Sequence, residues 1–130
     1  MTTELTILAW ALLLAILQIA LAGALSTRER GIQYNMSARD GKAPEPGPVT
    51  ARVQRALANL LETLPLFAAA VLAAHVAGRE GALTVLGCQI YLAARVIYVP
   101  LYAFGVPALR SLVWLASMAG LLMILVALLR

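Results

Sequence analysis

The sequence predicts an all-α integral membrane protein that folds as a single four-helix domain over residues 1–130. Three observations support this prediction. Of the 130 residues, 62% are hydrophobic and only 12% are charged, and a soluble domain of this length does not bury so much apolar surface. The apolar residues fall into four runs, each long enough to cross a bilayer as a helix. No change in composition along the chain indicates a second domain.

The first expected span covers about residues 5–25, and these 21 residues make about 31 Å of helix. No basic residue precedes this run, and it is too long for the apolar part of a signal peptide, so we expect a membrane helix in the mature protein. The second span covers about residues 53–76, the third about 82–103 and the fourth about 109–129.

The basic residues predict how the spans are oriented. Residues 26–52 are the largest polar segment, rich in proline and glycine after residue 40, and are expected to form a loop. This loop holds five of the ten basic residues, and Arg110 lies at the beginning of the fourth span, whereas Arg79 and Arg130 lie on the opposite side. We therefore expect loop 26–52 in the cytoplasm and both termini outside it. The short loops and plain termini favour a bacterial inner membrane.

One face of the second span is polar. Arg55, Asn59 and Glu62 lie at i, i+4 and i+7, so a helix places all three on one side. A charged side chain in the membrane interior costs roughly 2.5–3.5 kcal/mol and usually faces a polar cavity or another helix. We interpret this face as part of an intramembrane polar site.

The third span has a second polar face, formed by Tyr91, Arg95, Tyr98 and Tyr102 at helical spacing. Arg95 and Glu62 are expected at a similar depth, about 12–14 Å from the cytoplasmic ends of their spans. They could simply neutralise each other, which would make both of them structural. That pairing leaves the other polar residues unexplained, and their surplus positive charge favours a small anionic ligand.

The chain lacks the motifs of several other function classes. It has no metal-ligand spacing, no glycine-rich phosphate loop and no basic cluster typical of a nucleic-acid-binding surface. It also has no covalent nucleophile paired with a base. An enzyme with this sequence would therefore take its reactive atom from the bound molecule.

Three motifs in these spans resemble those of one membrane-protein family. Arg55-x-x-x-Asn59-x-x-Glu62-x-x-Pro65-x-Phe67 resembles the second-helix signature of the membrane-associated proteins in eicosanoid and glutathione metabolism (MAPEG). Arg95-x-x-Tyr98-x-x-x-Tyr102 resembles the third-helix pattern of that family, and Pro107-x-x-Arg110-Ser111 its path into the fourth helix. The resemblance covers essentially the whole chain. The family includes microsomal glutathione transferases and the synthases that form leukotrienes and prostaglandins.

The resemblance implies a homotrimer embedded in membrane lipid. Each glutathione molecule would bind between two subunits near the cytoplasmic face, and no metal would be needed. Arg55 and Asn59 would hold the polar ends of glutathione, and Glu62 its amino group. The other binding residues implied are Tyr98, Tyr102, Arg95 and, from the first helix, Arg28 or Arg30. Arg110 matches the arginine that stabilises the glutathione thiolate, the catalytic role, and a lipophilic second substrate would arrive from the lipid.

Two departures from the family pattern concern activity. Thr63 stands where some members have a tyrosine, and the segment between Tyr102 and Arg110 varies in length within the family. Three functions stay open from the sequence: a glutathione transferase or peroxidase, a thiol- or anion-binding member without transferase activity, and a non-catalytic membrane scaffold or assembly subunit. Glutathione binding would separate the third from the other two, and conjugation of an electrophile would separate the first from the second.

Overall fold

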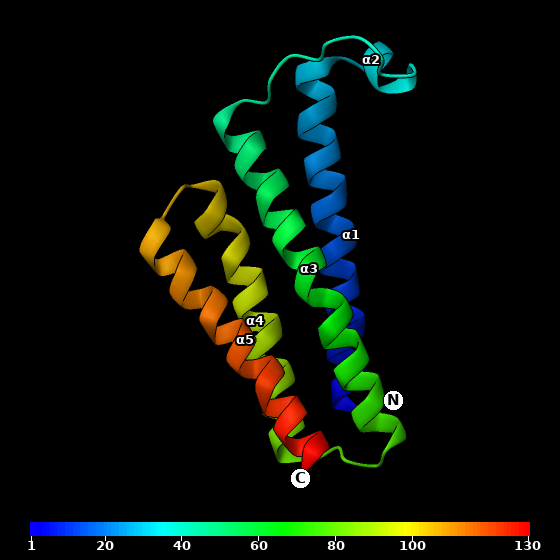
Figure 1. Cartoon of the computed structure of the whole chain (residues 1–130), viewed down its shortest axis with the longest axis vertical. Helices are drawn as coiled ribbons and strands as arrows, with labels where there is room; N and C mark the ends of the chain where they lie inside the picture. Colours follow the sequence, from blue (N-terminus) through cyan, green and yellow to red (C-terminus); the bar gives the residue numbers. More distant parts are fainter.

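The computed structural model describes all 130 residues as an antiparallel bundle of four long helices (Figure 1). The long helices are α1 (Thr3–Arg30), α3 (Pro48–Val76), α4 (Ala82–Ala103) and α5 (Pro107–Leu129), and a short helix, α2 (Ile32–Met36), lies between the first two. Each long helix contains a segment apolar enough to cross a membrane. The chain is therefore an all-α, multi-pass integral membrane protein, as the sequence predicts.

The helix ends lie where the sequence supplies caps. The Thr2 hydroxyl accepts a hydrogen bond from the first turn of α1, and Gly31, with φ of 89°, ends that helix. Pro48 and Pro107 begin α3 and α5, where a residue without an N–H loses no hydrogen bond. The expected loop over residues 26–52 is therefore too long. Residues 26–30 extend α1 up to the glycine, and residues 48–52 already belong to α3.

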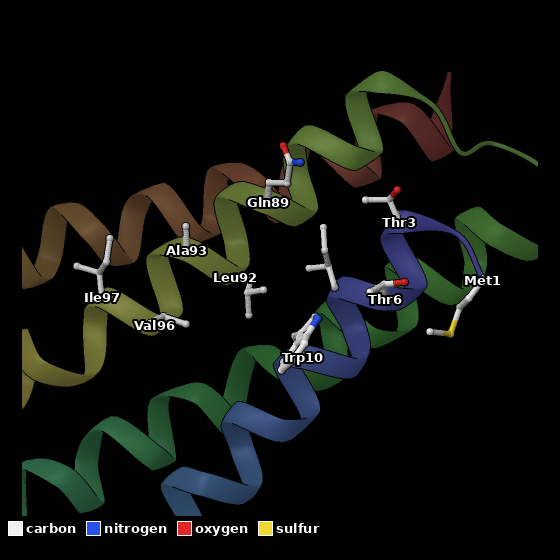
Figure 2. A pocket seen from close by; sticks show the side chains of 10 residues that line it. Met1, Thr3, Thr6, Trp10, Gln89, Leu92, Ala93, Val96 and Ile97 are labelled. Atoms are coloured by element: carbon white, nitrogen blue, oxygen red, sulfur yellow. The ribbon is translucent and has the colours of Figure 1, made fainter.

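The four long helices do not pack equally on one another. The closest pairing is α4 with α5, and α3 contacts each of the other three long helices. By contrast, α1 packs on α3 and α4 but not on α5. Grooves lie along two of these contacts, one between α1 and α4 (Figure 2) and the other between α3 and α5.

The close pairing of α4 with α5 depends on two glycines that face each other. A methyl group added at Gly87 would lie 2.6 Å from the carbonyl oxygen of Gly120, and one added at Gly120 would lie 2.6 Å from the carbonyl oxygen of Gly87. The backbones approach so closely that no side chain fits between them, as at many helix contacts in membranes.

The end of the bundle opposite loop 31–47 is fastened by polar side chains. The Thr2 hydroxyl donates to Glu80 at 2.8 Å, and the other oxygen of that carboxylate is 2.9 Å from Nδ1 of His75. Next to this group, the Thr84 hydroxyl donates to Glu4, which is buried. These bonds tie the beginning of α1 to the turn between α3 and α4.

Candidate functional site

Tyr102, in the last turn of α4, lies between two arginine side chains from two other helices. Arg55 of α3 donates a hydrogen bond from Nε to the Tyr102 hydroxyl at 3.1 Å. The guanidinium of Arg110, in the first turn of α5, lies 4.7 Å from the centre of the Tyr102 ring. Both contacts are favourable, because an aromatic face attracts a cation and a phenol oxygen accepts from one. Tyr102 therefore brings the beginnings of α3 and α5 to one point.

Two cavities share Arg110 in their walls. The smaller one, of about 190 Å³, is lined by Arg52, Arg55, Tyr102, Gly105, Pro107 and Arg110. The larger one, of about 340 Å³, is lined by Asn59, Tyr98, Arg110, Ser111, Trp114 and Leu115. Three guanidinium groups and no carboxylate line the smaller cavity, so its surface is strongly electropositive. We call the two together the arginine site.

Arg95 supports the larger cavity from inside the bundle. Its Nη1 donates to the Asn59 side-chain oxygen at 2.8 Å, and its guanidinium lies 4.5 Å from the centre of the Tyr98 ring. Arg95 is only 1% exposed, and its Nε and Nη2 have no hydrogen-bond partner in the chain. Asn59 and Tyr98 both line the cavity, so Arg95 fixes two of its walls at once.

Glu62 does not pair with Arg95. It is exposed on the outer side of α3, and the only salt bridge in the chain joins His75 to Glu80. The structural alternative, in which Glu62 and Arg95 neutralise each other, is therefore wrong within one chain. Similar depth does not make two side chains face each other. Arg95 points into the bundle, and Glu62 points away from it.

Tyr91 belongs to the core and not to the polar site. Its ring stacks on Phe67 with the centres 4.0 Å apart, and its hydroxyl lies 2.9 Å from the Thr63 hydroxyl. The interpretation of Tyr91 as part of the polar face of the third span is therefore wrong. Thr63, one of the departures from the family pattern, is buried and serves as the hydrogen-bond partner of this core tyrosine.

The first-helix arginines do not reach the arginine site within one chain. Arg28 is exposed, and the guanidinium of Arg30 lies 5.8 Å from the centre of the Tyr34 ring. Because α1 does not contact α5, neither side chain meets Arg110 in its own subunit.

The structure adds two residues that the sequence analysis did not assign to the site. Arg52 lines the smaller cavity, and its guanidinium packs over Gly105, 3.1 Å from where a β-carbon would lie. Trp114 lines the larger cavity, and its buried indole N–H has no partner in the chain. Helical spacing could have found both, because Arg52 precedes Arg55 by three residues and Trp114 follows Arg110 by four.

A comparison with protein families matches residues 7–130 to the MAPEG family. The chain belongs to the MAPEG family. This match confirms the resemblance drawn from the three motifs and covers all four membrane helices of this MAPEG protein. A search of curated proteins finds no match to the chain.

Proposed function

We propose that this MAPEG protein is a glutathione-dependent transferase or peroxidase whose thiol is activated at the arginine site. The observation that supports the proposal most is the convergence of Arg52, Arg55 and Arg110 around Tyr102. Glutathione carries two carboxylates, one ammonium group and one thiol, so it is a small anion. Guanidinium groups bind carboxylates through paired, charge-assisted hydrogen bonds, which suits a site rich in arginine.

In this proposal α3 and α4 supply the residues that bind glutathione, and α5 supplies the residue that activates its thiol. Arg55 and Asn59 of α3 hold the carboxylate ends of the tripeptide, and Tyr98 and Tyr102 of α4 line its pocket. Arg110 of α5 faces the sulfur, lowers the pKa of the thiol and holds the thiolate. The thiol proton leaves to solvent, the sulfur attacks the electrophilic atom of a lipophilic substrate, and the leaving group departs with its bonding electrons.

The same proposal requires neighbouring copies of the chain. Glu62 and Arg55 are exposed on the outer face of α3, where lipid would leave the carboxylate unpaired at a cost of several kcal/mol. The face continues into a groove of about 420 Å³ between α3 and α5, lined entirely by hydrophobic residues that include Ala69 and Ala73. A second copy against this face would cover the groove, take Glu62 out of lipid and bring its own first-helix arginines to the site. We propose a homotrimer, and native mass spectrometry in mild detergent should detect three subunits.

The proposed orientation has the segment of residues 26–52, which contains loop 31–47, in the cytoplasm and both termini on the other side of a bacterial inner membrane. Cys88, the only cysteine, is buried and should not react with the labelling reagent. Any labelling of a variant with a cysteine at Ser37 or Thr3 would therefore come from the new cysteine. In intact cells an impermeant reagent should label Thr3→Cys and not Ser37→Cys. The reverse pattern would overturn the orientation.

The decisive test compares two arginines of the site. Arg110→Ala should lower the turnover of chlorodinitrobenzene with glutathione on the order of a hundredfold or more, because losing one contact to a developing anion costs about 2.7–4 kcal/mol. It should also move thiolate formation, followed by ultraviolet absorbance, to higher pH. Arg55→Ala should mainly raise the Michaelis constant for glutathione, because a carboxylate is equally charged before and after the thiol ionises.

A matched control is Arg79→Ala, because Arg79 lies at the other end of the bundle and donates to the carbonyl of Arg130. This variant should retain the turnover and the Michaelis constant for glutathione of the unchanged protein. If Arg110→Ala leaves the turnover and the thiolate titration unchanged, the assignment of Arg110 is wrong. If purified protein binds glutathione but conjugates no electrophile, the anion-binding alternative replaces the transferase.

A further inference from the structure

The proposed function assigns no role to Arg52, although its side chain lines the smaller cavity of the arginine site. The three guanidinium groups of this cavity make only one hydrogen bond within the chain, from Arg55 to Tyr102. Arg52 has no carboxylate partner either, because the only salt bridge in the chain joins His75 to Glu80. All the donors of the Arg52 guanidinium are therefore free to bind a ligand.

The Arg52 guanidinium packs on Gly105, in the turn between α4 and α5. Gly105 has φ of 71°, a left-handed conformation that favours glycine. Cζ of Arg52 lies 3.1 Å from where a β-carbon of Gly105 would be, and Nε and Nη1 lie 3.4 Å from that point. Because these three atoms are almost equally distant from it, the flat side of the guanidinium faces the glycine. The N–H groups lie in the guanidinium plane, so this packing leaves them clear of the glycine.

The two cavities of the arginine site differ in size and in charge. Three guanidinium groups and no carboxylate line the smaller one, of about 190 Å³. Only one guanidinium, that of Arg110, lines the larger one, of about 340 Å³, and its other polar side chains include Asn59 and Tyr98. Sites that enclose a whole small molecule measure about 300–1,000 Å³. The smaller cavity therefore has room for only one end of a tripeptide.

The largest cavity of the protein does not compete for an anionic ligand. This groove, between α1 and α4, has no arginine or lysine in its walls (Figure 2). A carboxylate in the membrane region binds where guanidinium groups offer charge-assisted hydrogen bonds, which is the smaller cavity of the arginine site.

The two ends of glutathione differ in charge as well. The γ-glutamyl end carries an ammonium group next to its carboxylate, so its net charge is zero, whereas the glycine end carries a carboxylate alone. Guanidinium groups attract a carboxylate and repel an ammonium group, so the smaller cavity favours the glycine end, which is also the shorter one. Arg110, which would face the sulfur, lines both cavities, so the γ-glutamyl end then lies in the larger cavity.

We propose that the smaller cavity binds the glycine end of glutathione and that Arg52 is a specificity-determining residue of this subsite. Arg52 and Arg55 donate charge-assisted hydrogen bonds to the glycine carboxylate, and Gly105 holds the Arg52 guanidinium in place for this contact. The preferred substrates are thiols with a free carboxylate one residue beyond the cysteine. This inference rests on the proposed function, because it concerns how the arginine site selects its thiol.

The test compares the binding of glutathione with that of its glycinamide, in which a neutral amide of almost the same size replaces the glycine carboxylate. Isothermal titration calorimetry of the purified full-length protein in detergent micelles would measure both dissociation constants. The unchanged protein should bind glutathione more tightly than the glycinamide, on the order of tenfold to a hundredfold. Arg52→Ala should weaken glutathione binding on the order of tenfold and leave glycinamide binding almost unchanged.

Gly105→Asn tests the placement of Arg52 without removing its charge. Asparagine tolerates a left-handed φ better than most residues. Its β-carbon alone would lie 3.1 Å from Cζ of Arg52, so the guanidinium must move, and its amide would compete for the donors of Arg52. This variant should also lower the preference for glutathione over the glycinamide. Arg52→Ala combined with Gly105→Asn should lower that preference no further than Arg52→Ala alone.

Gly78→Asn is the matched control. Gly78 has φ of 68°, almost the same as Gly105, but a β-carbon there would meet nothing within 4 Å. It lies at the opposite end of the bundle, in the turn between α3 and α4. This variant carries the same backbone strain and should retain both dissociation constants.

The inference is overturned if Arg52→Ala weakens the binding of both ligands by the same factor, because Arg52 then acts only through the general positive potential of the site. It is also overturned if the unchanged protein binds the glycinamide as tightly as glutathione. In both cases the protein still binds glutathione, so the proposed function stands. An unchanged protein that binds neither ligand would contradict the proposed function and this inference together.

The role of Gly105 has its own outcome in the same experiment. If Gly105→Asn keeps the full preference for glutathione, as Gly78→Asn should, then Gly105 does not hold Arg52 in place and that part of the inference is wrong.

Discussion

The contact between Gly87 and Gly120 predicts that Gly120→Ala will destabilise the protein although alanine favours a helix. The new methyl group would lie 2.6 Å from the carbonyl oxygen of Gly87 and 2.9 Å from the backbone nitrogen of Tyr91, where ordinary contacts begin near 3.4 Å. Both atoms are backbone, so α4 and α5 must move apart to admit it. Such overpacking typically costs about 1–3 kcal/mol.

Gly23→Ala is the matched control, because a methyl group at Gly23 in the interior of α1 meets nothing within 4 Å. Alanine gains about 1 kcal/mol over glycine in a helix interior, and this gain applies at both positions. The difference between the two variants therefore isolates the cost of the clash. We expect Gly23→Ala to be more stable than Gly120→Ala by about 1–3 kcal/mol.

Unfolding by a denaturing detergent, followed by far-ultraviolet circular dichroism, would measure both variants. Gly87→Ala should resemble Gly120→Ala, and the double variant should lose less than the sum of the two, because both methyl groups separate the same helix crossing. Equal stabilities of Gly23→Ala and Gly120→Ala would show that the two backbones are not in contact, and the reasoning would fail.

Asn59→Leu should destabilise the protein by about 1.5–3 kcal/mol, because it removes the only hydrogen-bond acceptor of the buried Arg95 guanidinium. Combining it with Arg95→Met should restore most of that loss in the same unfolding assay, and a double variant no more stable than Asn59→Leu would contradict this. The hydrogen bond from His75 lowers the pKa of Glu80 below its ordinary value of 4.5. The resulting stabilisation is complete above pH 4.5 and is lost as the pH falls through the lower folded value, so His75→Ala should flatten the decline of the melting temperature in acid.

The fold could be predicted from the sequence because each membrane helix is a local property. An apolar run of sufficient length forms a helix whatever its neighbours are, and Gly31 and Pro48 indicate where two helices end and begin. Helical spacing groups Arg55, Asn59 and Glu62 on one side of α3. It does not show that Arg55 and Asn59 contact α4 while Glu62 points away from the bundle, because these directions depend on the packing of α3.

The candidate site could be predicted only in part, because periodicity places side chains on one helix but does not say which helix they meet. Tyr91 and Tyr98 share one face of α4, yet Tyr91 meets Phe67 in the core and Tyr98 lines the larger cavity. Nothing in the sequence shows that the indole N–H of Trp114 lacks a partner, because this depends on which side chains of other helices lie beside it. The contact of Glu4 with Thr84 joins residues 80 positions apart, and no local pattern predicts such a contact.

The division of the arginine site between helices has a consequence for biosynthesis. Arg52 and Arg55 enter the membrane with the first half of the chain, and Tyr102 and Arg110 are added only when the second half is made. Domains fold largely in the order of synthesis, so the site comes into existence at the final step, when the α4–α5 pair docks on α3. A ligand of the arginine site would therefore bind only the completed bundle. Its binding would stabilise the completed bundle relative to every partly assembled form.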